Sequence, residues 1–192
     1  MQVLESVFDS LNSGVRDRKS GFHTLVFSNI EDGEVATRTV ILRNFDSKKL
    51  ILYFNTDVRS PKVEALRLFP NSACLFYDVE QKTQLRIKTR SVIHYSDTVA
   101  STAWEKSALT SRKCYLTRFR PSQEIEECDD GISSQLKGRI PSISEASRGR
   151  ENFAVVANYI QSIDWLYLSS VGHKRAKFFF KNGGVVKRWL AP

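Results

Sequence analysis

The chain has 192 residues, of which 41% are hydrophobic, so it can bury a core without disulfides or metals. Its formal net charge is +8, and the Lys and Arg residues are spread among apolar ones instead of forming a basic tail. This charge suits an anionic partner, and it equally suits a plain basic surface. Cys74, Cys114 and Cys128 are far apart and lack CxxC spacing, which argues against a disulfide framework or a zinc site.

The sequence shows no membrane or secretion signal. No segment approaches the roughly 20 apolar residues that a membrane helix requires. Residues 1–14 contain acids and lack a long apolar run, so they do not resemble a signal peptide. We therefore expect a cytoplasmic protein without a membrane partner, folded as one domain over residues 1–192.

The N-terminal half predicts one helix followed by strands. Residues 1–20 repeat Val3, Val7 and Leu11 at helical spacing, which is typical of an amphipathic helix. The period then becomes that of strands, which we place at 22–30, 34–43 and 48–56 with turns at 31–33 and 44–48. Residues 59–69 predict a short helix, with Ser60 as its N-cap and Pro61 at its first position.

The rest of the chain predicts more strands around one helical insertion. Two strands, at 72–79 and 83–95, precede a helix at 97–109, and about 110–150 should form a short helix and a mobile loop. Further strands follow at 152–161, 163–170, 173–180 and 185–191, with a hairpin turn at Asn182-Gly183-Gly184. The lack of βαβ alternation favours a mainly β fold, a closed antiparallel barrel with peripheral helices.

Two of the N-terminal segments carry cations that could bind a ligand. Arg38 and Arg43 lie near the ends of an apolar strand and on opposite faces, so each needs a partner or solvent. Residues 55–62 form a strand-to-helix junction, where hydroxyls, cations and a helix N-terminus suit a phosphate. The polar side chains of this junction are Thr56, Arg59, Ser60 and Lys62. An ordinary capped helix with surface charges would give the same pattern.

Two later strands place polar side chains on a single face. Alternation puts Gln84 with three cations on one face of residues 83–90, while Leu85 and Ile87 take the other. His173, Arg175 and Lys177 likewise share a face, and a row of cations repels itself unless an anion lies over it. Both faces could also simply be solvated.

The order and spacing of these segments resemble the pyridoxamine 5′-phosphate oxidase-related FMN-binding family, over about residues 22–95 and again over about 152–192. The resemblance implies an antiparallel split β-barrel with peripheral helices. It also implies a homodimer with FMN at the subunit interface, and hydride transfer between a small substrate and the FMN ring.

Three stretches carry the resemblance most clearly. RTVILR (38–43) is similar to R-x-V-L-L-K, and NTDVRSPK (55–62) to Y-T-N-x-x-S-R-K, with Pro61 replacing an arginine and Arg59 standing nearby to compensate. TQLRI (83–87) is similar to R-Q-V-R, and Tyr167 and Lys177 stand where a tryptophan and an arginine are usual. The implied FMN contacts are Arg38, Thr39, Val40, Ile41, Arg43, Asn55, Thr56, Arg59, Ser60, Lys62, Gln84, Tyr167 and Lys177.

The departures from the family concern the substrate. YLTRFRPSQE (115–124) stands where the oxidases have Y-F-x-x-R-P-x-x-S, and HKRAK (173–177) replaces R-L-H-D-R. The substrate contacts implied are Arg43, Tyr115, Arg120, His173 and Arg175, and no catalytic residue is identified. Three alternatives stay open: an FMN-binding module or flavin reductase without pyridoxamine oxidation, a basic nucleic-acid-binding β-barrel, and a member that has lost its cofactor. The second is disfavoured because the cations stand singly at strand ends and turns.

Overall fold

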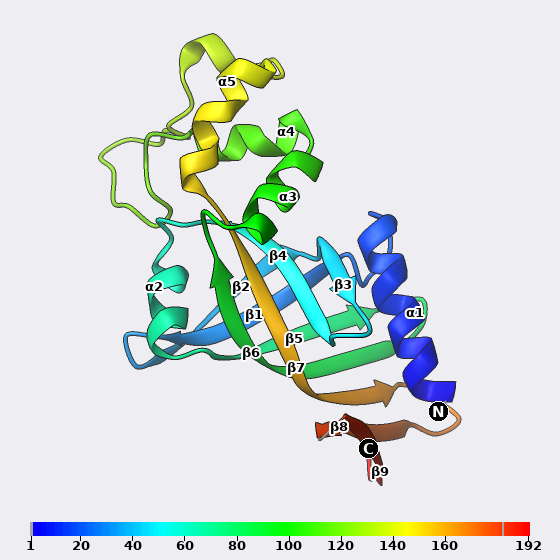
Figure 1. Cartoon of the computed structure of the whole chain (residues 1–192). Helices are drawn as coiled ribbons and strands as arrows, with labels where there is room; N and C mark the ends of the chain where they lie inside the picture. The colour runs from blue at the N-terminus through cyan, green and yellow to red at the C-terminus, as the bar shows by residue number, and fades with distance from the viewer. Residues whose placement is uncertain (1, 182) are drawn as a thin grey trace. The chain divides into compact units, whose positions relative to one another are not determined.

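The computed structural model describes residues 2–181 and 183–192 (Figure 1), so Asn182 of the expected hairpin turn lies outside the described residues. The chain divides into two compact units, and each is described by itself. The first unit comprises Met1–Phe54, Ala65–Val92 and Ala157–Pro192, and the second comprises Asn55–Glu64 and Ile93–Val156. The expectation of a single domain stays a prediction.

The described strands form one nine-stranded sheet in the order β2-β1-β5-β6-β7-β4-β3, with β8 pairing β7 and β9. Each pairing whose register is described is antiparallel. The mainly β, antiparallel prediction is therefore confirmed, but the strand order has two ends, so the sheet is open and not the closed barrel expected from strand number. The strands are β1 (Thr24–Glu31), β2 (Glu34–Ile41), β3 (Asn44–Asp46), β4 (Ile51–Asp57), β5 (Asn71–Asp78), β6 (Thr83–His94), β7 (Phe153–Tyr167), β8 (Lys174–Lys181) and β9 (Gly184–Leu190).

The helices are short, apart from the N-terminal one. None of those described is long and apolar enough to cross a membrane. They are α1 (Gln2–Arg16), α2 (Pro61–Leu68), α3 (Thr98–Lys106), α4 (Leu109–Arg112) and α5 (Ile143–Ser147), with the 3₁₀ helices η1 (Lys113–Leu116), η2 (Ser134–Leu136) and η3 (Arg148–Asn152).

Helix α1 packs its apolar stripe into the core of the first unit, as its periodicity predicted. Leu4, Val7 and Leu11 are buried, and the ring of Phe8 meets that of Phe45 edge-on at 5.3 Å between centroids. A Cβ at Gly14 would lie 2.3 Å from the carbonyl oxygen of Phe22, so only glycine fits this close approach. Helix α1 is thereby fixed against the start of the sheet.

A network of three hydroxyls and one amide, buried apart from the half-buried Ser72, links four strands of the first unit. The Ser72 hydroxyl lies 2.7 Å from that of Thr89 and 2.6 Å from that of Ser91. The Ser91 hydroxyl donates to Asn158 Oδ1 at 2.7 Å, and Asn158 Nδ2 donates to the carbonyl oxygen of Leu52 at 3.1 Å. Because buried polar groups must be paired, this hydrogen-bond network holds the strands in register.

Two predicted strand boundaries are wrong. Residues 44–48 were expected to be a turn, but β3 forms there because Phe45 is buried and pairs with Leu52. Residues 152–170 were expected to form two strands, but β7 is continuous from Phe153 to Tyr167. The polar pair at Gln161 and Ser162 does not end the strand, and Ser162 is buried within it.

The second unit has a small aromatic core of its own. Trp104 and Tyr115 each meet Phe153 edge-on, at 5.2 and 5.0 Å between ring centroids. Asp97 caps α3 by accepting from the backbone N–H of Ala100. The stretch expected as a short helix and a loop contains five short helices, and residues 117–133 between η1 and η2 are irregular.

Candidate functional site

The strand-to-helix junction of the second unit gathers three of the predicted phosphate ligands. Thr56 and Ser60 are buried, while Lys62 is half-buried. The Lys62 ammonium donates to Ser60 Oγ at 2.6 Å and to Thr56 Oγ1 at 3.2 Å. We call Thr56, Ser60 and Lys62 the phosphate cluster, since an ammonium and two hydroxyls at a helix start form a suitable site for an anion.

Local sequence explains why this cluster forms. Strand β4 ends at Asp57, whose carbonyl oxygen accepts the N–H of Ser60 at 3.1 Å and so closes a tight turn. The Ser60 carbonyl accepts the N–H of Val63 at 2.9 Å, and α2 begins at Pro61 as predicted. Helix N-terminal N–H groups carry partial positive charge, so this position favours an anionic ligand.

Arg59, from the same turn, is occupied by another contact. Its Nε and Nη2 donate to the two carboxylate oxygens of Asp57 at 3.0 and 2.7 Å, and Nη2 also donates to the carbonyl oxygen of Thr117 at 3.2 Å. The hydrogen bond to Asp57 raises the pKa of Arg59. Arg59 therefore stabilises the turn. That Arg59 compensates for the arginine that Pro61 replaces stays a prediction.

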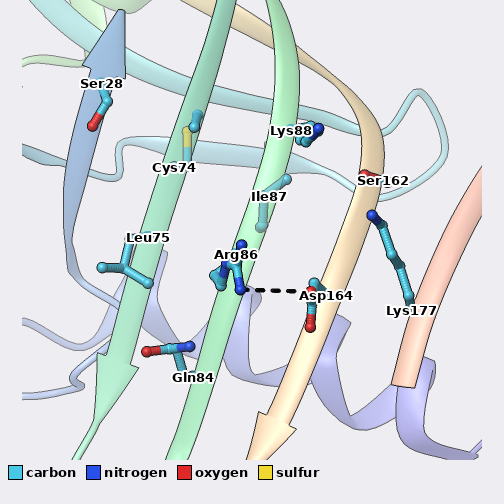
Figure 2. A pocket seen from close by; sticks show the side chains of 11 residues that line it. Ser28, Cys74, Leu75, Gln84, Arg86, Ile87, Lys88, Ser162, Asp164 and Lys177 are labelled. Carbon is cyan, nitrogen blue, oxygen red and sulfur yellow. Dashed lines mark ion pairs between the residues drawn. The ribbon is translucent and has the colours of Figure 1, made fainter. Parts of the chain in front are cut away.

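The first unit holds a cavity of about 450 Å³ beside the sheet strands β5, β6, β7 and β8, which we call the sheet cavity. Its volume lies in the range of small-molecule sites. Figure 2 shows Gln84, Arg86 and Lys88 along β6, with Asp164 on β7 and Lys177 reaching in from β8. The shared polar face predicted for β6 is confirmed, because Leu85 and Ile87 are buried on its other side.

A buried carboxylate lies among the cations of this cavity. Asp164 is 8% exposed, and Arg175 donates to its two oxygens at 3.0 and 2.9 Å. Arg86 Nη1 lies 4.0 Å from Oδ2, and Lys177 is directly opposite Asp164 in the register of β7 and β8. The hydrogen bond from Arg175 lowers the pKa of Asp164.

Asp164 was not among the predicted site residues. Its position inside the apolar run Ile163 to Leu166 could have indicated Asp164 as a site residue, because a charge buried on a strand needs a partner. Its main partner, Arg175, was predicted to contact substrate. In the structure the guanidinium of Arg175 is held by Asp164 and does not line the sheet cavity.

The other predicted FMN contacts of β2 lie in the first unit. Arg38 is half-buried, donates to the amide oxygen of Asn29 and forms an ion pair with Glu31. Thr39 is exposed, while Val40 and Ile41 are half-buried. Arg43 follows β2, is exposed, and has no hydrogen bond or ion pair through its side chain among the described residues.

Tyr167 and His173 do not line the sheet cavity. Tyr167 lines a separate cavity of about 240 Å³ with residues of α1, and its ring stacks with that of Trp165 at 6.3 Å between centroids. His173 is exposed, and its Nδ1 accepts the backbone N–H of Ser169 at 3.0 Å. The first unit thus brings Gln84 together with Lys177 and separates Tyr167 from them.

The remaining predicted residues belong to the second unit. Asn55 Nδ2 lies 3.5 Å from Ser107 Oγ, a marginal hydrogen-bond distance. Tyr115 belongs to the aromatic core and lines a cavity of about 410 Å³ together with Arg59 and Arg118. Arg120 is exposed and does not line that cavity, so the structure does not bring Tyr115 and Arg120 together there.

Comparison with known families confirms the resemblance read from the sequence. Residues 4–95 match the family model described as "Pyridoxamine 5′-phosphate oxidase, FMN-binding domain". No curated protein matches the chain. The match ends before β7. The contacts predicted for individual residues, inside and outside the match, stay predictions.

Solved structures share the fold of nearly the whole chain. A pyridoxamine 5′-phosphate oxidase-related, FMN-binding protein of Nostoc punctiforme is 17% identical, with a TM-score of 0.76 over 98% of this chain and 96% of that one. PhzG of Burkholderia lata, solved with tetrahydrophenazine-1-carboxylic acid, is 15% identical, with a TM-score of 0.72 over 100% and 91%. A Clostridium acetobutylicum protein related to general stress protein 26 is 9% identical, with a TM-score of 0.55 over 98% and 95%. These likenesses concern the split-barrel fold.

Proposed function

We propose that this chain, residues 4–95 of which match the model of the pyridoxamine 5′-phosphate oxidase FMN-binding domain, belongs to that family, binds FMN and acts as an oxidoreductase on a small substrate. The observation that carries the proposal is the phosphate cluster. Its Lys62 ammonium lies 2.6 Å from Ser60 Oγ and 3.2 Å from Thr56 Oγ1, and these are the positions to which the resemblance assigns the FMN phosphate.

The residues of the cluster suit a dianionic phosphate. Lys62 carries three N–H donors and a full charge, and the hydroxyls of Thr56 and Ser60 can each donate or accept. Charge-assisted hydrogen bonds of this kind contribute about 1.5–3 kcal/mol each. The helix start at Pro61 adds the partial positive charge of its N–H groups. These features support the assignment of the phosphate to this segment.

The sheet cavity supports an assignment of the isoalloxazine ring to the first unit. The amide of Gln84 offers a donor and an acceptor to a polar ring edge, and Leu75 offers apolar surface. Arg86 and Lys177 favour negative charge nearby. FMN, when bound, supplies the hydride chemistry, while the protein supplies position and electrostatics.

The proposal is tested by visible absorbance and by FMN titration of the purified protein. We expect a flavin spectrum and saturable binding. Lys62→Ala should weaken FMN binding by about tenfold or more, because it removes a charge-assisted hydrogen bond. Lys48→Ala, an exposed lysine between β3 and β4, is the matched control and should bind FMN like the wild type.

Two outcomes would count against the proposal. If Lys62→Ala retains full FMN affinity, the phosphate cluster is not the site. If the wild-type protein does not bind added flavin and instead binds single-stranded RNA in a salt-dependent way, as a mobility shift would show, the nucleic-acid-binding alternative is supported.

A flavin-binding module or flavin reductase without pyridoxamine oxidation is the second candidate. It is favoured by Arg175, which Asp164 holds, and by Tyr115, which packs in the aromatic core. Both residues were predicted to contact substrate. Release of hydrogen peroxide on addition of pyridoxamine 5′-phosphate to the flavin-loaded protein would support the oxidase. A loaded protein that leaves this substrate unchanged would support the module.

A homodimer and a cytoplasmic location complete the proposal. The apolar side chains along β9 are exposed in the single chain, which supports coverage by a second copy. The three cysteines are free, with Cys74 buried and Cys114 and Cys128 exposed, which fits a reducing compartment.

A further inference from the structure

The charge balance of the sheet cavity depends on one residue. Among the described residues that line the cavity, Asp164 is the only carboxylate, whereas Arg86, Lys88 and Lys177 are cations. We propose that Asp164 is a positioning residue that holds Arg175 outside this cavity and sets the charge that a bound flavin meets, thereby setting the preference for oxidised over reduced FMN. This inference rests on the proposed FMN binding.

The geometry shows how Asp164 acts on its neighbours. Arg175 contacts it through Nε and Nη2 at 3.0 and 2.9 Å, in the fork arrangement that fixes both partners. Because of this pairing, the Arg175 guanidinium does not line the sheet cavity. Arg86 lies 4.0 Å away on the cavity side, where Figure 2 marks its ion pair with Asp164.

Lys177 is the second cation on the cavity side. It faces Asp164 across the β7–β8 register, and cross-strand neighbours of this kind interact directly. Lys177 is also the residue that the family resemblance places at the flavin. The Asp164 carboxylate thus offsets part of the charge of Arg86 and Lys177 at the place where the flavin ring is proposed to bind.

This offset affects the two flavin states differently. Near neutral pH reduction adds negative charge to the flavin ring, so cavity cations stabilise reduced FMN more than oxidised FMN. The Asp164 carboxylate opposes this preference. By linkage, a change in the affinity ratio of the two states is also a change in the ease of reduction.

The inference predicts opposite effects for the two members of the pair. Asp164→Asn removes the negative charge and keeps the shape, so the ratio of the dissociation constants for oxidised and reduced FMN should rise about tenfold. Arg175→Gln removes the main partner of Asp164, so the cavity becomes more negative and the ratio should fall by a similar factor. Asp164→Glu retains the charge and should stay within about threefold of wild type.

The experiment is a titration of the apoprotein with oxidised FMN and, anaerobically, with dithionite-reduced FMN. Glu145→Gln is the matched control, because Glu145 also forms a two-pronged pair with an arginine, Arg139, but does not line the sheet cavity. A purely structural ion pair would change stability in both Asp164→Asn and Glu145→Gln and leave the affinity ratio unchanged.

The outcomes separate this inference from the proposed function. Failure of the wild type to bind either form of FMN contradicts FMN binding itself. Binding by the wild type with an unchanged ratio in Asp164→Asn overturns the role of Asp164. If Asp164→Asn does not fold, Arg175→Gln decides, because an unchanged ratio in that variant overturns the inference equally.

Discussion

Arg59 and Lys62 lie in the same turn, and the structure gives them different partners. Lys62 contacts two hydroxyls, whereas Arg59 is paired with the carboxylate of Asp57. Sequence alone predicted both as phosphate ligands, because both are cations at a helix start. The grouping of Thr56, Ser60 and Lys62 could be predicted from sequence, because these residues lie within seven consecutive positions.

The partners of more distant site residues could not be derived in the same way. Arg38 was predicted as an FMN contact, and its ion pair with Glu31 depends on the register of β1 and β2. Asp164 likewise meets Arg175 only because β7 and β8 pair in one register. A strand pattern shows which residues share a face, and it does not show which charged residue on the next strand satisfies them.

The first residue-scale prediction concerns Arg59. Asp57 is buried, so Arg59→Gln should leave a buried carboxylate short of a partner and lower the free energy of unfolding by about 1–3 kcal/mol. FMN affinity should fall much less than in Lys62→Ala. Urea denaturation and FMN titration measure the two effects, with Arg90→Gln, an exposed arginine of β6, as control. A tenfold loss of FMN affinity with unchanged stability would assign Arg59 to the phosphate instead.

At the scale of elements, alternation and helical period predicted α1, α2, α3 and the paired strands well. They failed where burial overrode a polar pattern. Strand β3 forms around the buried Phe45 where a turn was expected, and β7 continues through the buried Ser162. Helix α5 was expected as loop because its segment is rich in Ser and Gly. A Ser-x-x-Glu capping signature was nevertheless present, and Ser142 and Glu145 form that capping box.

The element-scale prediction follows from the charge of this cap. Hydrogen bonds from Arg139 and from the Ser142 backbone lower the pKa of Glu145 to about 2, from an ordinary 4.5. The carboxylate therefore stabilises the start of α5 at pH values above 4.5, and this contribution is lost as the pH falls toward about 2. Carboxyl chemical shifts followed by NMR should show this midpoint for Glu145. In Arg139→Gln the midpoint should move up toward 4.5, and an unmoved midpoint would contradict the pairing.

At the scale of the whole molecule, the two kinds of comparison cover different parts of the chain. The family match covers residues 4–95, whereas the structural likeness to the Nostoc protein covers 98% of the chain. The structural likeness therefore extends beyond the residues that match the family model. The insertion between β6 and β7 contains Tyr115 and Arg120, and the segment at 173–177 contains His173 and Arg175, so four of the five predicted substrate contacts lie outside the family match.

Self-association is the last prediction, and it concerns β9. This strand pairs with β8 along one edge, and every residue from Gly184 to Leu190 is exposed. Val186 and Trp189 are 50% and 61% exposed. Because an uncovered apolar edge strand promotes uncontrolled association, we expect a partner to cover β9. A symmetric second copy of the chain would cover this strand on both subunits at once. Sedimentation velocity should therefore show a dimer, and Trp189→Asp should weaken it by at least about tenfold, because the substitution places a charge in an apolar interface. Val171→Asp, at a loop residue that is 97% exposed, should leave the dimer intact. A monomeric wild type, or a dimer equally stable in Trp189→Asp, would remove β9 from the interface.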